Sequence, residues 1–309
     1  MPSSVGHTDQ TIEDVRVRAV QNWELIGTDG SDVLADARIQ LHWAAQLVAA
    51  PGNTYGIAKS DGAHTALCWD GERRLLVSEP IPAPKGFQVG LGILDLALVV
   101  FDERDRKVDE IELGGMSIDD GRLWLEDVFR TRLGRDTNFA LQLPEHDLPE
   151  HSVGGGGLLR FRPTWAFDEL DKLFGNAAAY LSAYANANAE SGYVRTWPHH
   201  FDTAILLDLE PDREMKEEKN SIGIGFSPGD STSSDPYWYV TPWPSPSVDA
   251  LSDTISPGRW QKEGWVGAVL PIAELAKERS PAAQLRVLDR FVVAAVKECR
   301  GLLAVDSSP

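Results

Sequence analysis

The sequence His199-His200-Phe201-Asp202 has the residue types and spacing that best fit acid–base chemistry. A strand is predicted at 201–209, and successive side chains of a strand point to opposite faces. His200 and Asp202 are then expected on one face, where the carboxylate can orient the imidazole as a general base. His199 is expected on the other face, towards the core. Glu263 is the predicted acid partner of this pair.

A metal ion at the same place would need ligands from several segments. Because His199 and His200 are expected on opposite faces, they cannot both face one ion. A further ligand would have to come from His64, Asp230 or Glu263. A hydrogen-bonded pair of His200 and Asp202 is the favoured interpretation, so no metal is assigned and no cofactor is identified.

Aromatic residues gather in the same part of the chain. Rings with hydroxyl or indole donors, set beside glycines and acids, are typical of a pocket for a sugar or another polar ligand. The predicted lining consists of Trp197, Tyr237, Tyr239, Trp243 and Trp265. Packing in the core is the alternative, because aromatic side chains provide much of the apolar burial of any core.

Glycines alternate with apolar residues in the predicted strand 221–227, which leaves one face of it almost without side chains. Either a ligand approaches this face, or Tyr237 and Tyr239 of the next strand cover Gly223 and Gly225. The second interpretation is favoured, because aromatic residues commonly pack across neighbouring strands.

Composition limits the class of protein. With 309 residues, 42% of them hydrophobic and 25% charged, the chain has the make-up of a globular protein with a large core. Its net charge of −18, without a run of basic residues, argues against nucleic acid and against anionic membranes as partners. A small molecule is the expected partner, and the oligomeric state is left open.

Cysteine usage and the distribution of apolar residues predict a cytoplasmic location. Cys68 and Cys299 are the only cysteines and form no disulfide framework, which fits a reducing compartment. The N-terminus has no basic region followed by an apolar run, as a secretory signal would have. The longest apolar stretch, 87–101, is too short to span a bilayer and is predicted to form a strand or a pair of strands.

Hydrophobic periodicity and capping residues predict the elements that must position these side chains. Helices are expected from Ser31 or Asp32 to about Ala50, after a Ser117–Asp120 capping box, from 164 to 189, and from 280 to Gly301. Strands are expected near 64–69, 74–77, 87–93, 108–113, 193–197, 201–209, 221–227, 236–242 and 264–270. The first helix places His42 and Gln46 one turn apart.

The segments between these elements read as loops. Residues 1–30 are predicted to be a loose arm or an edge element. Residues 134–164, with the glycine run 154–157, are predicted to be a flexible linker in which His146 and His151 are solvated.

The predicted fold class is α+β. Hairpins rather than crossover helices connect the strands, so the sheets are expected to be mainly antiparallel. Two similar halves are predicted, an N-terminal half at 1–150 and a C-terminal half at 151–309 that carries the candidate site. Both halves read as helix, strands, helix, an order that suggests an internal duplication.

Three motifs resemble the signatures of a family of uncharacterised bacterial proteins. They are Trp-Pro-His-His-Phe-Asp at 197–202, Gly-Phe-Ser-Pro-Gly-Asp at 225–230 and Tyr-Trp-Tyr-Val-Thr-Pro-Trp-Pro at 237–244. Leu-His-Trp at 41–43, the histidine-bearing strand at 63–67 and Glu-Gly-Trp at 263–265 are similar to the same family. The resemblance spans most of the chain and implies a bacterial source and one family architecture, but no activity.

Three classes of function follow. The leading hypothesis is a protein that binds a polar or sugar-like small molecule through the aromatic-lined pocket. The second is an enzyme that uses His200 and Asp202, with Glu263 or Asp230 as acid or metal ligand, such as a metal-assisted hydrolase. The third is a structural or interaction protein without a site.

Overall fold

The computed structural model describes residues 23–27, 32–82, 85–134, 140–210 and 219–306. The chain divides into two compact units, which are described separately. The first unit comprises 31–171 and 195–202, and the second comprises 1–30, 172–194 and 203–309. The chain passes from one unit to the other several times. The sequence predicts a single boundary at residue 150, and that boundary stays a prediction.

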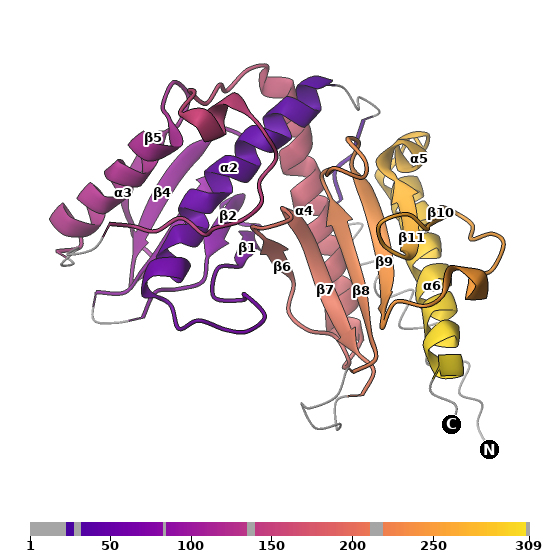
Figure 1. The fold of residues 1–309 in the computed structure, drawn as a ribbon. Coiled ribbons are helices and arrows are strands. Elements are labelled where there is room, and N and C mark those ends of the chain that lie inside the picture. The colour runs from indigo at the N-terminus through magenta and orange to yellow at the C-terminus, as the bar shows by residue number, and fades with distance from the viewer. Residues whose placement is uncertain (1–22, 28–31, 83–84, 135–139, 211–218, 307–309) are drawn as a thin grey trace. The chain divides into compact units, whose positions relative to one another are not determined.

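The sheet of the first unit is built from neighbouring antiparallel hairpins (Figure 1). In spatial order its strands are β6 (Arg195–Trp197), β1 (Leu67–Asp70), β2 (Leu75–Ser78), β3 (Phe87–Gly92), β4 (Ala97–Asp102) and β5 (Lys107–Glu112). The apolar stretch 87–101 is therefore a strand pair, as predicted. Its two arms pair from Phe87↔Asp102 to Gly92↔Ala97.

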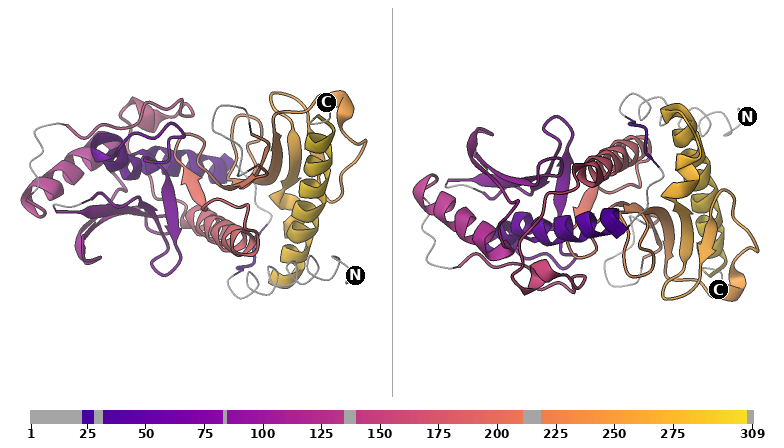
Figure 2. Two further views of the ribbon diagram at one scale, coloured as in Figure 1. Left: turned by 90° about the horizontal axis from the view of Figure 1, so that it is seen from below. Right: turned by 90° about the horizontal axis from the view of Figure 1, so that it is seen from above.

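Helices α2 (Asp32–Tyr55) and α3 (Ile118–Thr131) lie against one face of this sheet (Figure 2). The predicted capping box of α3 is confirmed, because Ser117 Oγ accepts from the Asp120 backbone and Asp120 accepts from the Ser117 backbone. The predicted end of α2 near Ala50 is wrong. Pro51 lies inside the helix, and the turn around it is buried, with Gly52 so close to the His64 carbonyl that a Cβ would lie 1.9 Å from the oxygen. Tertiary packing therefore outweighs the helix-breaking tendency of proline.

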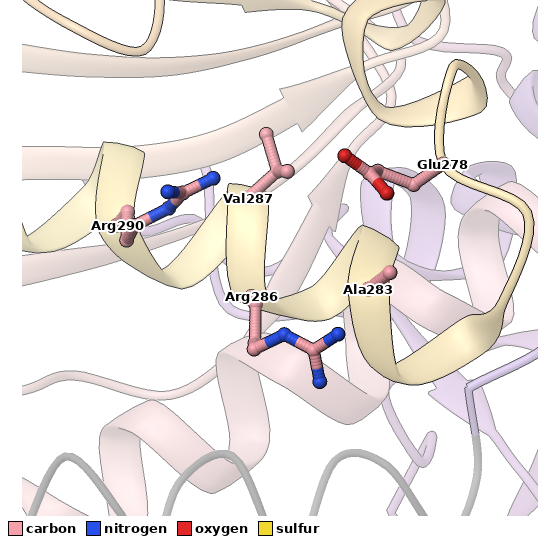
Figure 3. Close-up of a pocket in the computed structure, with 5 residues that line it drawn as sticks. All are labelled: Glu278, Ala283, Arg286, Val287 and Arg290. Carbon is pink, nitrogen blue, oxygen red and sulfur yellow. The ribbon is translucent and has the colours of Figure 1, made fainter.

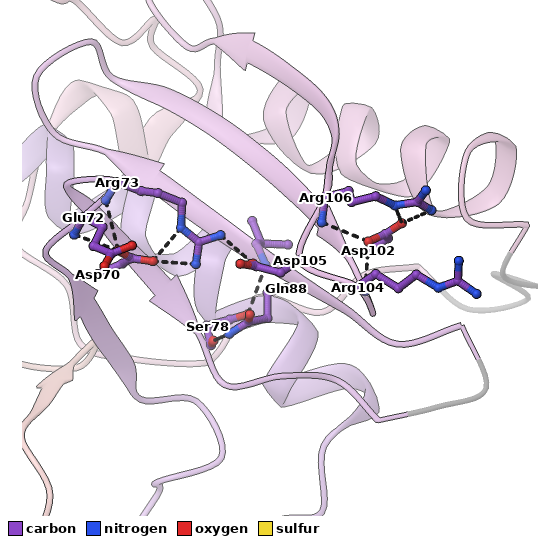
Figure 4. A network of polar contacts seen from close by, with 10 residues as sticks. Asp70, Glu72, Arg73, Ser78, Gln88, Asp102, Arg104, Asp105 and Arg106 are labelled. Carbon is purple, nitrogen blue, oxygen red and sulfur yellow. Dashed lines mark hydrogen bonds and ion pairs between the residues drawn. The ribbon is translucent and has the colours of Figure 1, made fainter.

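The other face of the first sheet carries a smaller apolar cluster, formed by Leu75, Val77, Val99 and Phe101. Arg73 covers it, with its guanidinium carbon 4.3 Å from the centre of the Phe101 ring. The same guanidinium binds the carboxylates of Asp70 and Asp105, which come from two different hairpin turns (Figure 4). Arg73 and its two carboxylate partners thus cover the apolar cluster on this face.

The predicted flexible linker is wrong for the described residues between 140 and 164. Ser152–Gly155 form a 3-10 helix, η1, and Gly154 lies against the Trp43 ring, where a Cβ would be 2.4 Å from a ring carbon. The Trp43 indole donates to the Pro149 carbonyl at 3.1 Å. Local composition is that of a loop, but close packing on α2 holds the segment in place.

The sheet of the second unit is also antiparallel. In spatial order its strands are β10 (Arg259–Gln261), β11 (Gly267–Pro271), β9 (Tyr237–Trp243), β8 (Ser221–Ser227) and β7 (Asp202–Asp208). The predicted bounds of β8 agree with the structure. β10 and the short helix α5 (Ile272–Ala276) were not predicted, because neither is long enough to show a hydrophobic period.

Helices α4 (Thr164–Ala187) and α6 (Pro281–Asp306) supply the core of the second unit. From α4, Phe174 meets Phe226 and Tyr180 meets Trp238, both edge-on, while α6 packs along β8, β9 and β11 (Figure 2). The predicted end of the last helix at Gly301 is wrong. Leu303 is 2% exposed, so burial of the next turn carries the helix past the glycine.

Residues 23–27 are fixed by two amide side chains. The Gln284 amide accepts from the Trp23 indole and the Ile26 backbone and donates to the Ile26 carbonyl. Asn176 bonds both backbone groups of Glu24. The expected loose arm is therefore wrong for this stretch, and 1–22 and 28–30 lie outside the described residues.

The predicted α+β class with mainly antiparallel strands and flanking helices is confirmed. Each unit has a sheet with helices against one face, whereas the internal duplication stays a prediction. Among the described residues, no helix is long and apolar enough to cross a membrane.

Candidate functional site

The predicted site residues divide between the two units. Trp197, His200 and Asp202 belong to the first unit. The other predicted residues, Tyr237, Tyr239, Trp243, Glu263 and Trp265, belong to the second. Each group is therefore described within its own unit.

In the first unit, the carbonyl of Pro198 is the point on which a buried polar network converges. Gln46 Nε2 donates to this carbonyl at 2.7 Å, and His42 Nε2 lies 2.8 Å from it. Since a carbonyl only accepts, His42 must carry its proton on Nε2. The predicted neighbours on α2, His42 and Gln46, are thus used together, and each is less than 10% exposed, at 6% and 1%.

Gln46 also fixes a third side chain, His146. Its Nε2 donates to two carbonyls, those of Pro198 and His42, so its Oε1 must be the acceptor for His146 Nδ1, 2.9 Å away. The proton of a neutral His146 therefore lies on Nδ1, and its Nε2 keeps a free lone pair. This histidine was predicted to be solvated, and that prediction is wrong.

The turn 198–201 is held by both its backbone and a ring stack. Phe201 N donates to the Trp197 carbonyl at 2.7 Å, and Phe201 has a positive φ of 57°. A non-glycine residue in this region is strained and persists only where its surroundings impose it. Here the imidazole of His42 stacks on the Phe201 ring at 5.1 Å and 9°.

The turn presents two imidazoles beside His146 and Trp197. The His199 ring lies 5.7 Å from His146, 4.4 Å from His200 and 5.9 Å from Trp197, in each case edge to face. His199 and His200 are exposed, and Trp197 is half-buried. We call His146, His199 and His200 the imidazole cluster.

These surroundings keep several of the imidazoles neutral at pH 7. Burial lowers the pKa of His42 to about 4. Partial burial among the neighbouring rings, with repulsion from His200 and His146, lowers the pKa of His199 to about 4. Burial and His200 lower the pKa of His146 as well. His42, His146 and His199 therefore offer neutral nitrogen donors and acceptors.

The expected geometry of His200 and Asp202 is wrong in two respects. β7 begins at Asp202, so His200 lies in the preceding turn and does not share a strand face with it. Among the described residues His200 contacts the His199 ring, and no hydrogen bond joins its imidazole to a carboxylate. His199, expected to face the core, is exposed, whereas Ile205 and Leu207 of β7 are buried as predicted.

No group of three His, Cys, Asp or Glu side chains in the described ranges is placed to hold a metal ion. Of the ligands considered from the sequence, His64 accepts from the Lys59 backbone and Asp230 caps its own loop. Glu263 is an exposed residue whose backbone carbonyl accepts from Gln261.

In the second unit, Tyr239 covers the bare strand at Gly225, so the favoured interpretation is confirmed there, but no tyrosine of the described residues covers Gly223. Gly225 pairs with Tyr239, and a Cβ on Gly225 would lie 2.4 Å from the Tyr239 ring and hydroxyl. Gly223 pairs with Thr241, and the atom nearest to a Cβ added there would be Thr241 Oγ1, at 3.6 Å. The strip therefore stays open at Gly223 and is filled at Gly225.

The aromatic site residues predicted in the second unit form one packed group and one exposed ring. Trp265 stacks on Tyr237 at 6.5 Å and meets Tyr239 edge-on at 6.2 Å. Tyr237 is buried and donates its hydroxyl proton to Asp230. Trp243, in contrast, is 53% exposed.

A pocket lies on α6, and none of its lining residues was predicted for the site. Arg286, Val287 and Arg290 of α6 line it together with Ala283 and Glu278 (Figure 3). Figure 3 shows the two guanidinium groups pointing in different directions from the helix. They therefore do not converge on one ligand group.

The sequence indicated Trp197 and His200 but missed the role of His146. The available signal was the pair His42 and Gln46 within the apolar run of α2 from Leu41 to Ala50, because buried polar groups require partners. No family model, curated protein or solved structure matches this chain. The resemblance to a bacterial family stays a prediction.

Proposed function

We propose that the first unit binds a small polar molecule at the imidazole cluster, beside the Trp197 ring. The observation that carries this proposal is the hydrogen bond by which Gln46 fixes the orientation of His146. The side-chain oxygen of the buried Gln46 accepts from His146, and its nitrogen donates to the Pro198 carbonyl. Pro198 belongs to the turn that carries the other two imidazoles of the cluster. Binding sites are commonly built in this way, with exposed ligand-contacting groups oriented by a buried second layer.

The chemistry of the cluster favours a hydroxylated or otherwise polar ligand. Neutral imidazoles offer one donor and one acceptor nitrogen each, and an indole ring offers a flat apolar surface. The strained Phe201 supports the same conclusion, because strained residues gather at ligand-binding and catalytic sites. The aromatic group of the second unit supports this role less, because its rings fill the space over Gly225 themselves.

Catalysis by His200 is the alternative, and it has weaker support. A general base is normally oriented by a partner, and no carboxylate bonds this imidazole among the described residues. The base of such an enzyme would more readily be His146, whose Nε2 lone pair is set by Gln46.

The proposal is tested by nuclear magnetic resonance of the histidine side chains. The 15N-labelled protein is titrated with monosaccharides, polyols and hydroxy acids at pH 7. A ligand of the site is expected to shift the imidazole signals of His146, His199 and His200 together. His64 is the internal control, because its ring bonds a loop backbone in the same unit.

The matched variants are His200→Ala and His64→Ala. Because His200 is exposed and bonds no backbone group in the described residues, His200→Ala is expected to lower the melting temperature by less than about 2 °C and to abolish binding. His64→Ala should leave binding intact. The proposal fails if no compound shifts the cluster, or if both variants bind equally well.

A further inference from the structure

We infer that the imidazole cluster binds an oxyanion, such as a carboxylate, sulfate or phosphate group. The cluster gains protons when the oxyanion binds. The inference rests on the proposed function and names its ligand class. The arguments are the charges that face the cluster, the free nitrogen of His146 and the exposure of the turn.

Among the described residues, the charges that lower the pKa values of His146 and His199 are those of neighbouring imidazoles. On His146 the acting charge is that of His200, and on His199 the acting charges are those of His200 and His146. The buried His42 is acted on by Arg38 of α2 and by His146 and His200. None of these interactions involves a carboxylate, although the chain carries 47 acids against 29 basic residues. The cluster can therefore be neutral or positive, but not negative.

The arrangement of the nitrogens determines what changes when protons are added. His146 Nδ1 already donates to Gln46, so a second proton has to enter at Nε2, on the side away from that amide. Protonated Nε2 becomes a charged donor on the half-buried His146 ring. Charge-assisted hydrogen bonds from such donors are the usual way to hold carboxylate and phosphate oxygens.

Without a ligand, this proton is resisted by the burial of His146 and by the charge of His200. The His199 ring also lies close, 5.7 Å from the His146 ring between centres. An anion removes both obstacles, because it supplies the opposite charge and replaces the lost solvation. Binding and protonation must then favour each other, since the two equilibria are linked. Affinity for an oxyanion is expected to rise as pH falls from 7.5 to 5.5.

Sulfate is the probe, because its charge stays constant over this range. Titration calorimetry at constant ionic strength, in two buffers of different ionisation enthalpy, measures both the dissociation constant and the protons taken up. Uptake of about one proton, with an affinity at pH 5.5 at least tenfold above that at pH 7.5, is expected. The imidazole signals of His146, His199 and His200 should shift, and those of His64 should not.

His146→Gln and His64→Gln are the matched variants. His146→Gln should reduce the pH dependence at least threefold, and His64→Gln should preserve it. Binding of a neutral polyol at the cluster without binding of sulfate overturns the inference and leaves the proposed function standing. Zinc binding with proton release, in place of sulfate binding, also overturns the inference. If neither polyols nor sulfate shift the cluster, both fail.

Discussion

Gln46→Leu is the substitution that most directly perturbs the network behind the site. The side chain is 1% exposed and makes hydrogen bonds of 2.7 Å to Pro198 O, 3.0 Å to His42 O and 2.9 Å to His146 Nδ1. Leucine has a similar volume and replaces none of them. At about 0.5–1.5 kcal/mol for each bond, the free energy of unfolding should fall by about 2–3 kcal/mol. The bond to His42 O counts least, because it lies within one helix.

Urea unfolding followed by tryptophan fluorescence measures this loss. The midpoint should fall while the slope stays constant, because the surface exposed on unfolding is unchanged. Gln88→Leu is the matched control, since Gln88 is half-buried and its amide bonds one carbonyl, that of Ser78, at 3.0 Å. It should cost less than about 1 kcal/mol. An equal loss for both variants would refute the role given to Gln46.

The remaining predictions concern packing, charge and capping. Gly225→Ala should lower the free energy of unfolding in urea by about 1–3 kcal/mol, because the added Cβ would clash with Tyr239. Gly223→Ala should cost less than about 1 kcal/mol. Equal losses would contradict the finding that Tyr239 covers Gly225. The folded state holds the pKa of His42 near 4, below its value of 6.5 in the unfolded chain. Between these two pH values the unfolded state binds more protons than the folded state. The free energy of unfolding should therefore be fully present above pH 6.5 and fall by about 3 kcal/mol as the pH drops to 4. Unfolding curves across this range check the slope, and its persistence in His42→Gln would argue against this assignment. Ser117→Ala should cost about 1 kcal/mol of unfolding free energy through loss of the α3 cap, and a loss below about 0.3 kcal/mol would count against the capping box.

The sequence predicted the elements that carry a strong local signal. β8 shows a regular alternation of small and apolar residues over 221–227, and its bounds agree with the structure. The Ser117–Asp120 box likewise contains its own start signal. The ends of α2 and α6 were predicted too early, because Pro51 and Gly301 are stop signals only where no buried turn follows.

The site was predicted in part, for a physical reason. His42 and Gln46 lie on one helix, so their proximity follows from helical geometry alone. Their common partner, Pro198, lies 152 residues from Gln46, and His146 lies 100 residues from it. Contacts at such distances leave no periodic signal in a single sequence. The prediction that His200 and Asp202 share a strand face was wrong because the chain turns at 198–201 before β7 begins.

The proton positions on His42 and His146 test the central claim most directly. Long-range 1H–15N spectra of the imidazoles at pH 7 distinguish the two neutral tautomers. The network requires a proton on Nε2 of His42 and on Nδ1 of His146, with both rings uncharged. A single Nδ1–H form of His146 that is lost in Gln46→Leu is the predicted result. A His146 ring that is protonated on Nε2 in both proteins would contradict the arrangement from which the proposed site is built.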